Sequence, residues 1–132
     1  MSDTEMGGRR ILVVEDEMLI ALTIEETVQA NGGEIVGPVA TLERALKLAE
    51  EETFDAAILD VTIRGGKVYP VAEVLLARGI PFVIASGYED WVLPEALRDK
   101  ARLMKPFTTA ALEEQLRLLC GGAKTPGVAA KP

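Results

Sequence analysis

The chain of 132 residues contains no histidine and only one cysteine, Cys120. Without an imidazole it can neither carry a phosphoryl group on histidine nor use histidine as a general base. A single cysteine excludes an internal disulfide and fits a reducing compartment, so we expect a cytoplasmic protein.

Long apolar runs and basic charge are also scarce. No apolar stretch approaches the ~20 residues that cross a bilayer, and the acidic, glycine-bearing start shows no secretory signal. Fourteen Lys and Arg stand against 21 Asp and Glu, a net charge of −7. Nucleic-acid binding depends on basic surface, so we expect neither a nucleic acid nor a membrane as partner.

The remaining composition is that of one globular domain, with 48% hydrophobic and 27% charged residues. We expect residues 1–8 to be a flexible N-terminus and residues 9–120 to form the domain. Residues 121–132 are rich in Gly, Pro and Ala, and we expect a disordered tail there.

Strand-like and helix-like segments alternate, which predicts an α/β fold with a parallel sheet. We expect Thr41 to cap the second helix, Pro38 to lie at a sheet edge, and residues 86–93 to be largely irregular. The predicted strands are 10–15, 34–39, 54–60, 81–86 and 100–104. The other predicted helices are 18–30, 68–77, 94–99 and 108–119, with a turn at 64–66.

Polar residues close four of the five predicted strands. Glu15 ends the first and Asp16 follows it, Asp60 ends the third, Ser86 ends the fourth and Lys105 follows the fifth. Open α/β sheets bind their ligands outside the carboxyl ends of the strands. We therefore expect these side chains to converge on one rim.

That set of side chains predicts a Mg²⁺-dependent phosphorylation site. Mg²⁺ takes one or two carboxylates, here Asp16 and Asp60, with Glu15 helping through water. Asp60 as nucleophile would form an acyl phosphate, while Lys105 would neutralise the phosphoryl charge and Ser86 would donate a hydrogen bond. Taken alone, the acidic residues after the first strand could equally be helix caps.

Four motifs in this order resemble the response regulator receiver domain over about residues 9–119. They are Val13-Val14-Glu15-Asp16-Glu17, Ile58-Leu59-Asp60, Ile84-Ala85-Ser86-Gly87 and Met104-Lys105-Pro106-Phe107. The resemblance implies a flavodoxin-like (βα)5 fold with a five-stranded parallel sheet in the order 2-1-3-4-5. It also implies that Asp60 accepts a phosphoryl group from a histidine kinase or a histidine phosphotransfer protein. Mg²⁺ would be bound by Asp16, Asp60 and the backbone carbonyl of Thr62, with Glu15 assisting.

The chain departs from the common receiver pattern at Arg102, where receivers usually carry an aromatic switch residue. The segment Pro81-Phe82-Val83-Ile84-Ala85-Ser86-Gly87-Tyr88 instead resembles the signature of the FAT GUY subfamily, single-domain receivers of alphaproteobacteria. Two positions differ from that signature: Ile84 replaces a phenylalanine, and Ser86 replaces a threonine but keeps the hydroxyl.

The resulting functional prediction is a stand-alone phosphoacceptor of a two-component system or phosphorelay. Such a protein catalyses only its own phosphorylation and dephosphorylation. It either binds a downstream effector protein or passes the phosphoryl group on, and we prefer the relay role. Arg102 argues against the usual phosphorylation-driven dimer, so we expect a monomer. A cis bond before Pro106 would aim Lys105 into the site. The expected switch region comprises Gly87, Tyr88, Trp91, Arg102 and Pro106.

A haloacid-dehalogenase-like phosphohydrolase is the alternative from another class, since it also uses an aspartate nucleophile, Mg²⁺ and a lysine. Such an enzyme needs a second acid two residues after the nucleophile, where this chain has Thr62. The chain also lacks residues for a substrate cap. A degenerate receiver that binds partners without phosphorylation is disfavoured, because every acidic ligand is present.

Overall fold

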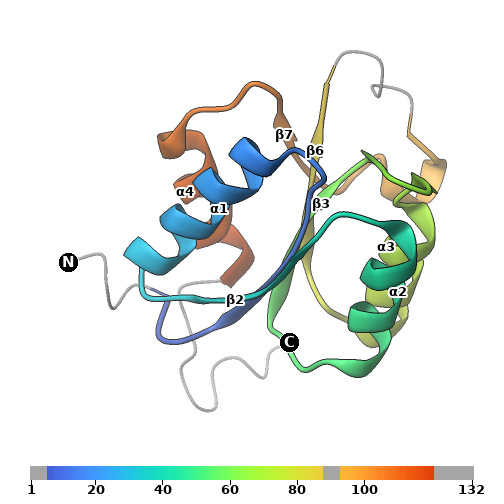
Figure 1. The fold of residues 1–132 in the computed structure, drawn as a ribbon, viewed down its shortest axis with the longest axis horizontal. Coiled ribbons are helices and arrows are strands. Elements are labelled where there is room, and N and C mark those ends of the chain that lie inside the picture. Colours follow the sequence, from blue (N-terminus) through green and yellow to red (C-terminus); the bar gives the residue numbers. More distant parts are fainter. Residues whose placement is uncertain (1–5, 88–92, 121–132) are drawn as a thin grey trace.

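The fold is built around one five-stranded parallel sheet (Figure 1). The computed structural model describes residues 6–87 and 93–120, so residues 1–5, Tyr88, Trp91 and residues 121–132 lie outside the described residues. Within the expected flexible N-terminus, Met6 is described and is buried, and its N–H donates to the Asn31 carbonyl at 2.9 Å. The sheet order is β2-β1-β3-β6-β7, which is 2-1-3-4-5 when its strands are counted along the chain, and this confirms the prediction. Its strands are β1 (Arg10–Val14), β2 (Glu34–Val39), β3 (Ala56–Asp60), β6 (Phe82–Ser86) and β7 (Ala101–Met104).

Two layers of helices enclose the sheet (Figure 1). Helices α1 (Met18–Ala30) and α4 (Thr109–Cys120) cover one face, and α2 (Leu42–Glu51) and α3 (Tyr69–Arg78) cover the other. Between β6 and β7 the described residues form only a 3-10 turn, η3 (Glu95–Leu97), where a helix over 94–99 was predicted. This segment closes by i to i+3 bonds, from the Leu97 N–H to the Pro94 carbonyl and from the Arg98 N–H to the Glu95 carbonyl.

The central strands are buried on both faces, which explains their uninterrupted apolar sequences. Alternate residues of β1 serve different cores. Ile11 and Val13 pack with α1 and α4, whereas Leu12 and Val14 pack with the α2 and α3 side. The sheet is thereby fixed between two cores, and its carboxyl edge is held in place.

Local signals in the sequence account for most element boundaries. The Thr41 hydroxyl caps α2 by accepting a bond from the Arg44 N–H at 3.3 Å, as predicted. Gly79 ends α3 with a φ of 72°, the left-handed conformation that glycine adopts at no steric cost. Strand β3 begins two residues later than expected, because the Asp55 carboxylate accepts the Arg10 N–H while buried Phe54 packs into the core.

A small hairpin follows Asp60, where the sequence predicted only a turn. Its strands are β4 (Thr62–Ile63) and β5 (Gly66–Lys67), and Gly65 turns between them with a φ of 98°. The tip is tied to the loop after β2, since the Arg64 N–H donates to the Ala40 carbonyl at 3.2 Å, and to the start of α2, since the Leu42 N–H donates to the Arg64 carbonyl at 2.8 Å. The residues directly after Asp60 are thus fixed by pairing within the hairpin and by hydrogen bonds from its tip to the segment around Leu42.

No helix within the described residues combines the length and apolar character needed to span a membrane.

Candidate functional site at the carboxyl edge of the sheet

Parallel pairing brings the ends of four strands to one rim, and β1 lies beside β3 there, with Val14 opposite Leu59. The Lys105 N–H donates to the Ser86 carbonyl at 2.8 Å, which links the ends of β7 and β6. The Val61 N–H donates to the Ala85 carbonyl at 3.1 Å, which links the ends of β3 and β6. The carboxylates that follow β1 and β3 and the ammonium that follows β7 therefore share one small volume.

The Lys105 ammonium lies among three carboxylates. Its Nζ is 3.1 Å from Glu15 Oε1, 3.2 Å from Asp60 Oδ2 and 3.7 Å from Glu17 Oε1. The Glu15 and Asp60 side chains are 1% and 6% exposed, whereas the Glu17 side chain is 64% exposed. Two of the three ion pairs are therefore buried, and the third is at the surface.

One lysine does not neutralise the carboxylates around it. Burial and the neighbouring Glu15 raise the pKa of Asp60 to about 7, against the lowering effect of Lys105. Burial lowers the pKa of Lys105, but the carboxylates of Glu15 and Asp60 outweigh it and raise the pKa above its ordinary value. Excess negative charge at neutral pH is the electrostatic condition for binding a cation.

Three carboxylates are arranged as a metal site would require. Oxygen atoms of Glu15, Asp16 and Asp60 lie within 4.8 Å of one another. An all-oxygen set from adjacent strand ends suits a hard divalent cation such as Mg²⁺, which takes few protein ligands and keeps several waters. The predicted residues therefore fit the ion.

Ser86 is completely buried at the end of β6. Its hydroxyl has no hydrogen-bond partner among the described residues. Buried polar groups are nearly always bonded, so an unbonded hydroxyl at the end of β6, the strand that pairs with β3 and Asp60, suggests a ligand that it would contact.

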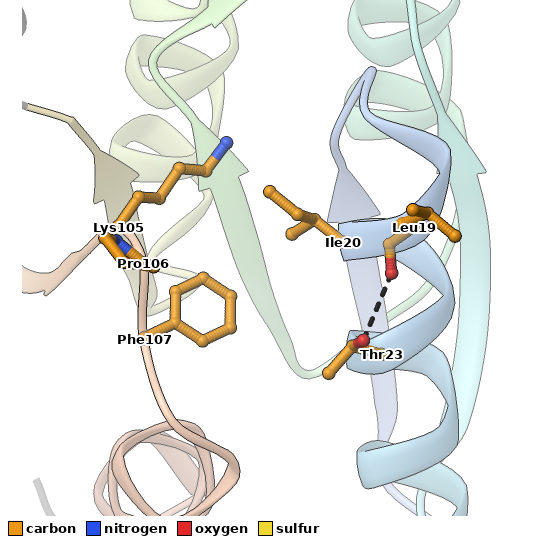
Figure 2. Close-up of a pocket in the computed structure, with 6 residues that line it drawn as sticks. All are labelled: Leu19, Ile20, Thr23, Lys105, Pro106 and Phe107. Atoms are coloured by element: carbon orange, nitrogen blue, oxygen red, sulfur yellow. Dashed lines mark hydrogen bonds between the residues drawn. The ribbon is translucent and has the colours of Figure 1, made fainter.

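A shallow apolar groove adjoins Lys105 on the side of α1 (Figure 2). Its volume is about 190 Å³, and Phe107 faces Ile20 across it. Leu19, at its rim, is 79% exposed. The peptide bond between Lys105 and Pro106 is cis, as the sequence analysis considered. The groove is lined by Leu19, Ile20, Thr23, Lys105, Pro106 and Phe107.

The remaining predicted residues lie around this site or beyond it. Thr62 opens the hairpin after Asp60, and its hydroxyl accepts a bond from Lys67 Nζ at 2.8 Å. Gly87 directly follows β6, and Arg102 is half-buried on the edge strand β7, paired with Ile84. Two further members of the expected switch region, Tyr88 and Trp91, lie outside the described residues.

Two features were missed by the sequence analysis. Glu17 was given no role of its own beyond the possibility that the acidic residues after the first strand are helix caps, yet its side chain makes no capping bond and lies near Lys105. The groove beside α1 was also not foreseen. Its one sequence signal is the adjacent pair Met18 and Leu19, which extends the apolar surface of α1 beyond the stripe that packs on the sheet.

Comparisons with known proteins agree with this architecture. No protein-family model matches the chain. The regulatory protein PdtaR of Mycobacterium tuberculosis is 33% identical over 114 residues, which cover 83% of this chain and 56% of PdtaR. The chain thus spans about half the length of this curated relative.

Three solved structures match over nearly their whole length. The solution structure of SdrG from Sphingomonas melonis is 43% identical, with a TM-score of 0.74, and the match covers 89% of this chain and 99% of SdrG. A BeF3-activated conformation of SdrG is 46% identical, with a TM-score of 0.69, over 83% of this chain and 95% of that one. The receiver domain of sensor histidine kinase PA1611 from Pseudomonas aeruginosa, with magnesium in its active-site cleft, is 25% identical. Its TM-score is 0.69, and the match covers 87% of this chain and 99% of that domain.

These likenesses confirm the resemblance stated from the sequence and give the phosphohydrolase alternative no support. The fold, the order of the strands and the near-complete overlap with SdrG lead to one conclusion. The chain belongs to the response regulator receiver domain family, and within it resembles the FAT GUY single-domain regulators.

Proposed function

We propose that this protein accepts a phosphoryl group on Asp60 from a phosphohistidine of another protein. The observation that carries the proposal is the cluster of Glu15, Asp16 and Asp60, in which the buried Glu15 and Asp60 pair with Lys105. The unbonded hydroxyl of buried Ser86 ends the neighbouring strand β6. Since the chain has no histidine, the donor must be a second protein or a small molecule.

The chemistry follows from the positions of the side chains. A carboxylate oxygen of Asp60 attacks phosphorus, an O–P bond forms, and the P–N bond to the donor histidine breaks with its electron pair going to nitrogen. Lys105, 3.2 Å from Asp60 Oδ2, balances the charge that the phosphoryl oxygens bring. Ser86 donates its free O–H to one of those oxygens.

Mg²⁺ is the cofactor that the donor set fits. Asp16 and Asp60 would bind the ion directly, the backbone carbonyl of Thr62 would complete the protein ligands, and Glu15 would assist. When bound, the ion neutralises charge between Asp60 and the incoming phosphoryl group. Support comes from the acidic cluster of this chain and from the magnesium reported in the PA1611 receiver domain.

We further propose that the donor is a protein whose phosphohistidine sits on an apolar surface seated over the groove of Figure 2. The groove supports this because Lys105, which contacts Asp60, is also one of its lining residues. Leu19 lies at its rim and is largely exposed. Exposed apolar side chains gathered near a reactive site are a usual mark of a protein-binding surface, so this exposure also supports a protein donor.

Labelling of Asp60 tests the phosphoacceptor proposal. The wild-type protein, incubated with Mg²⁺ and acetyl phosphate, should gain one phosphoryl group, measured by intact-protein mass spectrometry. Asp60→Asn should gain none, because an amide oxygen does not form an acyl phosphate. Stoichiometric labelling of Asp60→Asn would refute the assignment.

A pair of leucine variants tests the protein donor. Leu19→Ala should slow transfer from a phosphorylated histidine kinase or histidine phosphotransfer protein several-fold, while labelling by acetyl phosphate stays unchanged. Leu118→Ala is the matched control, because Leu118 is also strongly exposed, at 63%, but lies on α4. Equal transfer rates in both variants would place the donor surface elsewhere.

A further inference from the structure

Glu17 is a charged residue that the proposed phosphorylation reaction does not use. It occupies the position before α1, and its N–H donates to Glu15 Oε2 at 3.1 Å. That bond fixes the backbone of Glu17 to a buried carboxylate. Its side chain does not cap the helix, and its Oε1 lies 3.7 Å from Lys105 Nζ.

The position gives Glu17 two effects on an anion that approaches Asp60. Its carboxylate is exposed and lies beside Lys105, so its negative charge would repel an anion that approaches the ammonium. It also competes for Lys105, the ammonium that a phosphoryl group must engage. The other two carboxylates around Lys105 are buried and belong to the acidic cluster. The Glu17 side chain is 64% exposed, so its substitution should disturb the packing of the site little.

We propose that Glu17 is a specificity-determining residue that slows phosphorylation by free anionic donors and so favours a donor that is held by protein contacts. This inference rests on the proposed function, because it concerns the rate at which Asp60 is phosphorylated. A protein donor docked over the apolar groove gains binding energy elsewhere, and the repulsion from one surface carboxylate then matters less.

The size of the effect follows from charge and distance. One unit charge opposed to a dianion a few ångströms beyond van der Waals contact, in largely aqueous surroundings, changes a rate by about two- to fivefold. Salt reduces this, since the Debye length is about 8 Å at physiological ionic strength. The effect should also scale with the charge of the donor.

Charge-neutral substitution provides the test. At saturating Mg²⁺ and low ionic strength, Glu17→Gln should be phosphorylated by acetyl phosphate about two- to fivefold faster than wild type. The gain should be smaller with phosphoramidate, which carries less net negative charge, and should shrink with added salt. Glu17→Asp, which keeps the charge, should stay near the wild-type rate.

Glu26→Gln is the matched control, because Glu26 is an exposed glutamate on the same helix and its substitution changes net charge equally. Equal rates for Glu17→Gln and Glu26→Gln, or a slower Glu17→Gln, would overturn the inference. A gain that is insensitive to salt and donor charge would also overturn it. Absence of labelling in the wild type, or labelling in Asp60→Asn, would instead refute the proposed function.

Discussion

The two edges of the parallel sheet differ in how far their charged side chains are exposed to solvent. At the amino edge, Arg10 lies 3.8 Å from Glu34 and 4.0 Å from Glu52, and all three side chains are at least 38% exposed. At the carboxyl edge, Lys105 is 17% exposed, and two of the three carboxylates beside it, those of Glu15 and Asp60, are almost fully buried. The amino edge resembles an ordinary solvated surface network, whereas the carboxyl edge concentrates charge where water screens it little.

The contrast separates stability from function. Exposed ion pairs contribute about 0–1 kcal/mol each, so Arg10 and its partners are replaceable. Buried like charges destabilise a fold unless a counter-ion offsets them, which the raised pKa of Asp60 reflects. We therefore expect the carboxyl edge of the sheet to bind a cation that offsets these charges.

The largest expected effect is on metal binding at the carboxyl edge. Asp16→Ala should weaken Mg²⁺ binding by about ten- to a hundredfold, since even residues that only support a metal ligand have effects of this size. A Mg²⁺ titration followed by calorimetry or by fluorescence of the single tryptophan measures it. Unchanged affinity would mean that the cluster is not the metal site.

The pH dependence of stability should reveal the cost of burying the Asp60 carboxylate beside Glu15. In the metal-free protein Asp60 keeps a proton up to about pH 7 that the unfolded chain loses near 3.8. The folded state therefore binds more protons in that window, and the free energy of unfolding should fall as pH rises through it. Urea unfolding in a chelating buffer, at a series of pH values, would show this slope.

Asp60→Asn is the control for that slope, because it removes the titrating group. It should flatten the dependence and raise the free energy of unfolding above neutral pH by about 1–2 kcal/mol. This is less than a pKa rise of some three units would give at ~1.36 kcal/mol each, because Lys105 loses one of its partners. If the free energy of unfolding depended on pH equally in wild type and Asp60→Asn, the raised pKa of Asp60 would not be the cause of the slope.

Ser86 tests whether the carboxyl edge is arranged for a phosphoryl group as well as for a metal. Ser86→Ala should weaken binding of beryllofluoride, a phosphoryl mimic, by about fivefold, the loss of one hydrogen bond. Stability should hardly change, because the hydroxyl has no partner within the described residues. Ser86→Thr keeps the hydroxyl and should bind the mimic nearly as wild type; weakening equal to that of Ser86→Ala would argue against the hydrogen bond.

The smallest effect is expected at the amino edge. Glu34→Gln removes an exposed partner of Arg10 and should lower the free energy of unfolding by less than about 0.5 kcal/mol. Phosphorylation of Asp60 and Mg²⁺ affinity should not change. If Glu34→Gln lowered Mg²⁺ affinity or Asp60 phosphorylation as strongly as the substitutions at the carboxyl edge, the two edges would not differ in function as described.

The sequence by itself determined a parallel sheet with helices on both faces and the acidic residues that meet Lys105, while the order of the strands was implied only by the resemblance to the receiver family. Apolar runs that end in Asp60 or in Glu15 and Asp16 carry that information locally, because parallel strands must end on the same side. The cap at Thr41 and the left-handed Gly79 are likewise readable from single residues.

Tertiary structure decided what depends on contacts between distant segments. The hairpin after Asp60 exists because its tip bonds to the loop after β2, and two strands of two residues each carry too little pattern to be recognised. The sequence allowed the acidic residues after the first strand, Glu17 among them, to be helix caps, and only the tertiary structure shows Glu17 beside Lys105, 88 residues later in the chain. Likewise, the groove beside α1 forms where Leu19 and Ile20 meet Phe107, and a periodic pattern within one helix cannot show which apolar residues the rest of the chain leaves uncovered.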